Sequence, residues 1–166
     1  MQRYSSHHGP VLVLILGLWA SSCSAAPQTC VFDPLDAPVP NWNGGKPFYV
    51  RQTEIALGVS RIEASTAHGL VVVRTWSCDH YGLTANLIVS NPTLSASAIR
   101  SEIAWLAEVI LQPDDVLAIV NAIEKTGGML PMDSELAVED SGYDLFVVSG
   151  VVAGELTILS IRIKQS

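Results

Sequence analysis

The sequence predicts an α+β fold: one antiparallel sheet, made of two three-stranded meanders, with two consecutive helices on one of its faces. Two observations predict this class. Three short segments have the apolar patterns of strands, two have apolar residues at helical spacing, and three more again have strand patterns. The helical segments follow the strands as a block instead of alternating with them, which indicates α+β. The expected order is β-β-β-α-α-β-β-β, in a single domain at residues 48–166.

The first meander is expected to contain strands at residues 54–62, 70–76 and 83–89. In the first of these strands the apolar side chains change face beside Gly58, which indicates a β-bulge. The second strand is apolar on both faces, as a central strand is, and the third has one wetter face. Turns at residues 65–69 and 79–82 join the strands, and Asn91-Pro92 ends the meander.

Two helices are expected after this meander. Ser95 or Ser97 can cap the first helix. Its apolar residues share one face at helical spacing: Ile99, Ile103, Leu106 and Ile110. The second helix is expected at residues 113–125 and begins with a proline, which suits a first turn. Asp114 and Asp115 complement the positive end of its dipole.

The second meander is expected at the C-terminal end of the chain. Its strands are predicted at residues 136–138, 143–152 and 156–163. A turn at residues 139–142 joins the first two strands, and a compact hairpin turn at Ala153-Gly154 joins the last two. The helices and both meanders therefore account for the whole predicted domain.

The N-terminus has the layout of a secretory signal peptide, which we place at residues 1–22. An uncharged apolar run at residues 11–19 follows Arg3 and precedes small residues, and it is too short to span a bilayer comfortably. Residues 23–47 are rich in proline and are expected to form a tether. The sequence therefore predicts an exported protein.

The stretch Ala20-Ser21-Ser22-Cys23 resembles the box at which bacterial lipoprotein signal peptides are cleaved before a cysteine. The resemblance implies that Cys23 carries the lipid of a membrane anchor, on the periplasmic side of a bacterial cell envelope. The alternative is ordinary cleavage after Ala25 or Ala26, which would give a soluble periplasmic or secreted protein.

Two cysteines remain after either cleavage. If Cys23 is acylated or removed, Cys30 and Cys78 form an even pair in an oxidising compartment. We therefore expect a disulfide bond between Cys30 and Cys78, which would pin the tether to the domain.

The mature chain is acidic. All 16 acidic residues but only eight of the nine basic ones follow the signal peptide, so its formal net charge is about −8. A domain with this negative charge lacks the basic surface with which proteins bind nucleic acid or an anionic membrane. The membrane is expected to be reached through the lipid anchor alone, and a basic protein partner is favoured over an acidic one.

No catalytic or metal-binding signature is present in the sequence. The single local constellation is Cys78-Asp79-His80-Tyr81, where a thiolate beside a histidine would be needed for nucleophilic catalysis. A cysteine that is paired with Cys30 has no thiolate, and two ligands fall short of a zinc site. We therefore expect no catalytic residue, no metal and no cofactor, and we do not expect an enzyme.

Two predicted turns hold the candidate residues for partner binding. The first turn supplies Asp79, His80 and Tyr81, and the acidic segment after the helices supplies Glu139, Asp140 and Asp144. Carboxylates can steer a basic partner, and an exposed tyrosine can anchor it. The resulting hypothesis is a binding protein of the inhibitor or immunity type, which occupies a basic exported enzyme or toxin. The alternative is a structural or assembly accessory lipoprotein of an envelope complex.

Overall fold

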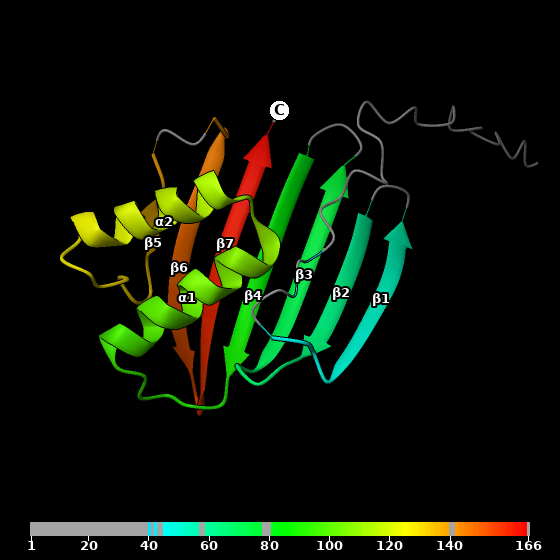
Figure 1. Ribbon diagram of the computed structural model, residues 1–166, viewed down its shortest axis with the longest axis horizontal. Coiled ribbons are helices and arrows are strands. Elements are labelled where there is room, and N and C mark those ends of the chain that lie inside the picture. Colours follow the sequence, from blue (N-terminus) through cyan, green and yellow to red (C-terminus); the bar gives the residue numbers. More distant parts are fainter. Residues whose placement is uncertain are drawn as a thin grey trace, which may run out of the picture.

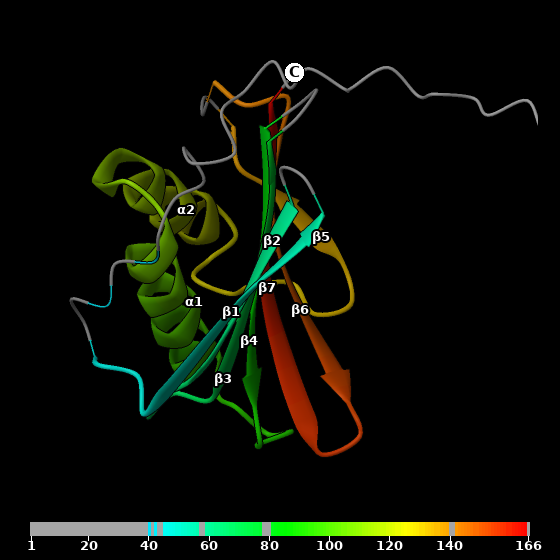
Figure 2. The same ribbon diagram turned by 90° about the vertical axis from the view of Figure 1, so that its right-hand side faces the viewer.

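A computed structural model describes Pro40, Trp42 and residues 45–56, 59–77, 81–139 and 142–165. The described residues form one antiparallel sheet of seven strands, in the order β1-β2-β3-β4-β7-β6-β5, and two helices (Figure 1). Both helices lie on the same face of the sheet (Figure 2). The signal peptide, Cys23, Cys30, Cys78, Asp79, His80 and Asp140 lie outside the described residues.

The elements follow one another in two blocks of strands with the helices between them. The first block contains β1 (Tyr49–Ala56), β2 (Val59–Ser65), β3 (Leu70–Ser77) and β4 (Tyr81–Val89). The helices are α1 (Ala96–Ile110) and α2 (Pro113–Lys125). The second block contains β5 (Glu135–Ala137), β6 (Leu145–Ala153) and β7 (Leu156–Gln165). The predicted class, an antiparallel sheet with two consecutive helices on one face, is confirmed.

The first block contains one strand more than the three predicted for it from the sequence. The expected strand at residues 54–62 is divided between β1 and β2, which pair antiparallel with Ala56 opposite Val59. The change of face therefore coincides with the passage from β1 to β2, where the alternation of side chains starts again on a new strand. A register shift between Glu54 and Ala56 shows that β1 also contains an irregularity.

The core lies between the helices and the sheet. On the central strands, every second side chain points at the helices and is almost fully buried: Val71, Val73, Leu83, Ala85, Leu87, Leu159, Ile161 and Ile163. Helix α1 packs on β4 and β7 with Ile103 and Leu106, while α2 contributes Ile119 and Ile123 to the same core. The apolar side chains that recur every two residues in the strands and every 3.6 residues in the helices thus form one apolar layer.

Specific contacts fix where α1 begins and how it meets the sheet. Ser95 caps the helix, since its hydroxyl accepts a hydrogen bond from the Ala98 amide at 3.2 Å. In the turn between β2 and β3, His68 stacks on Trp105 with ring centroids 4.0 Å apart. The Nδ1 atom of His68 also lies 2.8 Å from the Glu102 carboxylate. This turn is therefore held against α1 by both stacking and polar contact.

Candidate functional site

At one edge of the sheet, formed by the ends of strands, β3 ends and β4 and β6 begin (Figure 1). The register places Tyr81 of β4 opposite Gln165 of β7. Asp144 precedes Leu145, which is paired with Lys164 of β7. Residues that are far apart in the sequence therefore reach the same level of the sheet at this edge.

A tyrosine and a carboxylate are joined here. The Tyr143 hydroxyl donates a hydrogen bond to the Asp115 Oδ2 atom at 3.1 Å. The Tyr143 ring also packs edge-on against Phe146, with centroids 5.5 Å apart and an interplanar angle of 86°. Burial raises the pKa of Tyr143 to about 12, and the charge of Asp115 and the hydrogen bond add to this rise. The N-terminal turn of α2 is thereby linked to the segment before β6.

Tyr81 belongs to the same cluster. Its side chain is half-buried, and this burial is the main reason that its pKa is raised to about 12. The neighbouring Tyr143 and Asp115 contribute further to the rise, since negative charge near a phenol disfavours its ionisation. We call Tyr81, Asp115 and Tyr143, together with Glu139 and Asp144, the acidic edge.

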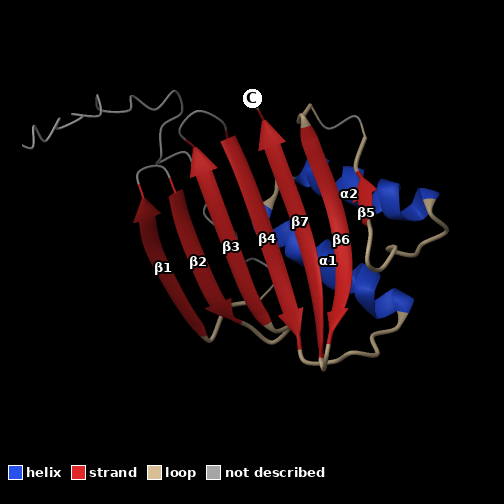
Figure 3. Cartoon of the chain, turned by 180° about the vertical axis from the view of Figure 1, so that it is seen from behind, coloured by secondary structure: helices blue, strands red, loops and turns tan. Residues whose placement is uncertain are grey.

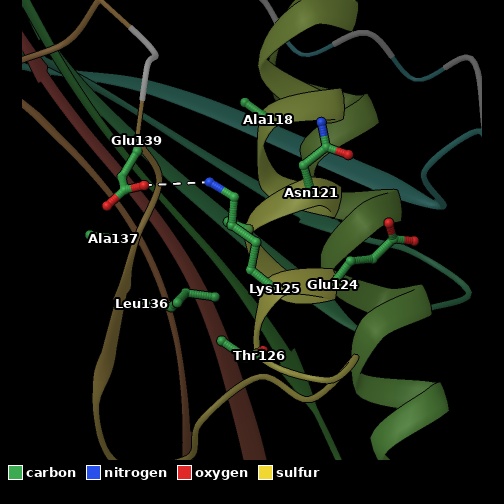
Figure 4. Close-up of a pocket in the computed structure, with 9 residues that line it drawn as sticks. Ala118, Asn121, Glu124, Lys125, Thr126, Leu136, Ala137 and Glu139 are labelled. Atoms are coloured by element: carbon green, nitrogen blue, oxygen red, sulfur yellow. Dashed lines mark hydrogen bonds and ion pairs between the residues drawn. The ribbon is translucent and has the colours of Figure 1, made fainter.

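Glu139 takes part in a groove between α2 and β5 (Figure 4). Its Oε2 atom lies 3.4 Å from Nζ of Lys125, and both side chains are mostly exposed. The groove has a volume of about 680 Å³ and is lined by Ala118, Asn121, Ala122, Glu124, Lys125, Thr126, Leu136, Ala137 and Glu139. The Glu124 Oε1 atom accepts a hydrogen bond from Nη2 of Arg100 at 2.5 Å. Exposed ion pairs of this kind contribute little to stability, so Glu139 is available to a partner.

Three of the six residues predicted to bind a partner are described. Tyr81 and Glu139 have the contacts given above, and Asp144 is exposed. The sequence alone does not bring Asp115 and Tyr143 together with Tyr81. It assigns Asp115 to the helix dipole and Tyr143 to a strand, because nothing local indicates that α2 and the segment before β6 come together.

The titration of the two tyrosines tests this cluster. Substituting Asp115 by asparagine removes a negative charge, so we expect the pKa of both Tyr81 and Tyr143 to fall below their wild-type values of about 12. Phenolate absorbance recorded during an alkaline titration measures this change. Asp114→Asn is the matched control, since Asp114 is exposed and neither tyrosine pKa depends on it. Equal titration curves for both variants would contradict the cluster.

The same shifts predict how stability depends on pH. A phenol whose pKa is about 10 in the unfolded chain and about 12 in the folded one binds its proton more tightly when folded. Its contribution to stability is therefore fully present below pH 10 and is lost as the pH rises towards 12.

Within the part of the chain that the structure describes, no three histidine, cysteine, aspartate or glutamate side chains are grouped as a metal ion would require. Among the same residues, no helix is long and apolar enough to cross a membrane. Comparisons with protein families, curated proteins and solved structures each find no match to this chain.

Proposed function

We propose that this chain is an exported, lipid-anchored binding protein of the cell envelope that acts by occupying a protein partner, as an inhibitor or immunity protein does. The partner we expect is a basic exported enzyme or toxin. The observation that carries the proposal is the acidic edge, where Tyr81, Asp115 and Tyr143 come together from three separate segments.

The chemistry of the acidic edge suits this role. Tyrosine side chains supply much of the binding energy at protein interfaces, because they combine a large apolar ring with a polar end. Carboxylates accelerate the encounter with a basic partner and select against acidic ones. Asp115 supplies a carboxylate beside two tyrosines, and the exposed Asp144 directly follows Tyr143 in the chain.

The fold holds this cluster rigid. Tyr143 is fixed by its hydrogen bond to Asp115 and by its contact with Phe146, so little side-chain freedom is left to lose on binding. A steric mechanism follows: the edge fills a basic cleft and excludes the substrate. Acylation of Cys23 would keep the protein in the compartment that such a partner enters.

A structural or assembly role in an envelope complex is the second candidate. The observation that favours it is a set of exposed apolar side chains on the strands, including Tyr49, Leu70 and Val151. Such side chains are common at stable interfaces within larger assemblies.

Affinity capture with matched charge reversals tests the proposed function. The processed protein is immobilised and exposed to an envelope extract at low and high salt. We expect capture of one basic hydrolase in a one-to-one ratio, weakened by salt and accompanied by loss of that hydrolase's activity. Asp115→Lys is expected to weaken the complex by about tenfold or more. Glu155→Lys, the same reversal in the turn between β6 and β7 at the far end of the sheet, is expected to leave it unchanged.

Two results would refute the role of the acidic edge. Capture of several envelope proteins at fixed ratios, unaffected by Asp115→Lys, would replace the inhibitor by the assembly accessory. An equal loss of binding in both reversals would show that net charge, and not this cluster, controls the interaction.

A further inference from the structure

The face of the sheet that points away from α1 and α2 differs in charge from the rest of the protein. In Figure 3 this face is turned to the viewer, and no described helix or loop lies over it. We call it the open face. The strand registers place five basic side chains on it: Arg51, Arg61, Arg74, Arg162 and Lys164. Among the strand residues that the structure describes, two acidic side chains share it, Glu63 and Glu135. Its formal charge is therefore +3, whereas the whole chain carries −7.

Three of the arginines lie in one row across the strands. Arg61 of β2 is opposite Arg74 of β3, which is opposite Thr84 of β4, which in turn is opposite Arg162 of β7. Like charges directly opposite each other on neighbouring strands destabilise a sheet. The approach of Arg74 to Arg61 therefore costs stability, and a carboxylate from a partner would relieve this repulsion.

The arginine row retains free capacity for hydrogen bonds. Arg61 pairs with Glu63 at 2.6 Å, and Arg162 pairs with Glu135. Arg74 is exposed and has no ionic partner among the described residues. The Nε atom of Arg162 is buried and has no hydrogen-bond partner within the described part of the chain. A partner's carboxylate could accept two hydrogen bonds from the exposed Arg74 guanidinium in a bidentate manner.

Apolar side chains flank the arginine row on both sides. On one side, Trp76 lies across Gly82, next to the row. On the other side, about 14 Å along the strands, a row of four aliphatic side chains contains Leu70, Ile88, Ile158 and Val151. Leu70 and Val151 are exposed by 43% and 41%. Arginine and tryptophan beside exposed aliphatic groups are the composition of a protein interface.

We propose that the open face is a second docking surface, which binds an acidic protein whose carboxylates meet the arginine row and whose apolar side chains cover the aliphatic row. This inference is independent of the proposed function, because it assigns a different surface and a partner of opposite charge. A simple anionic polymer would neutralise the arginines but leave the aliphatic row in water. The observations therefore favour a protein over a polyanion.

The proposal is tested with defined probes and charge-reversed variants. The probe is a short synthetic peptide of glutamates with regularly spaced leucines, added to the isotopically labelled, processed protein and followed by amide chemical shifts. We expect shifts on β2, β3, β4 and β7 at residues of the open face, and weaker binding as salt is raised. Arg74→Glu is expected to weaken binding by about tenfold, since Arg74 has no ion pair whose loss would disturb the fold.

Arg100→Glu is the matched control, because Arg100 belongs to α1, on the other side of the sheet. It is expected to bind the peptide as the wild type does. Shifts confined to the helices, or equal losses in both variants, would overturn the proposal. Polyphosphate binding to the open face as tightly as the peptide would replace the protein partner by an anionic polymer. Concentration-dependent self-association that Arg74→Glu abolishes would replace it by a second copy of this chain.

Discussion

Truncating Leu106 to alanine is expected to lower the free energy of unfolding by about 3 kcal/mol. Leu106 is fully buried on α1, in the core cluster that joins this helix to β4 and β7. The truncation removes apolar contacts and leaves a cavity that surrounding side chains fill only in part. Alanine is the best helix former, so the loss measures packing and not helix propensity. Denaturant unfolding followed by circular dichroism measures the change.

Leu117→Ala provides the matched control. Leu117 belongs to α2 and is 60% exposed, so the same change of residue should alter stability by less than about 0.5 kcal/mol. If both substitutions cost the same, then α1 does not pack on the sheet as the structure places it. The core would then have to be assigned anew.

Leu106 also illustrates which part of the fold could be predicted. It shares one helix face with Ile99, Ile103 and Ile110, and all four are buried. The spacing of apolar residues is a local property, so it predicted both helices, the start of α2 at Pro113 and the class of the fold. The cap at Ser95 was equally readable, because its hydrogen bond spans only three residues.

The outer part of the sheet was harder to predict. Residues 49–55 of β1 are all exposed, so no face of this strand is marked by apolar residues. Without such a mark, the sequence does not reveal an edge strand, and the hairpin between β1 and β2 was taken for one bulged strand. Alternating apolar and polar residues identify a strand because one of its faces is buried. An edge strand that is exposed on both faces does not need this alternation.

The candidate surfaces depend on strand register and on contacts between elements. Arg61, Arg74 and Arg162 are far apart in the sequence and form a row only because β2, β3, β4 and β7 pair as they do. Net charge concealed this row, since a chain can be acidic overall and still carry a basic face. In the same way, the contact between Asp115 and Tyr143 depends on where α2 lies over the sheet.

Substituting Gly82 by alanine is expected to destabilise the protein by about 2 kcal/mol and to displace Trp76 from the open face. A Cβ atom at Gly82 would lie 2.0 Å from Cε2 of the Trp76 indole and 2.3 Å from its Nε1. The backbone φ of Gly82 is not positive, so alanine fits the strand conformation and the effect is steric alone. Because the added Cβ atom would overlap several atoms of the indole ring, a small shift of the ring does not relieve the clash.

Two measurements separate displacement of the ring from general destabilisation. The indole N–H resonance of Trp76 should move in Gly82→Ala, and denaturant unfolding should give the loss of stability. Gly45→Ala is the control, since nothing lies within 4 Å of a Cβ atom there and its φ is also unremarkable for an L-residue. An unmoved indole resonance in Gly82→Ala would show that Trp76 does not lie across the glycine.

The result also bears on the open face. Trp76 flanks the arginine row, so its displacement should weaken binding of the acidic, leucine-containing peptide while leaving the charges of Arg61, Arg74 and Arg162 in place. Arg74→Glu, in contrast, removes charge and leaves the indole across Gly82. A loss of peptide affinity in both variants would mean that the open face binds through aromatic and ionic contacts together, which is what distinguishes a protein interface from simple attraction between charges.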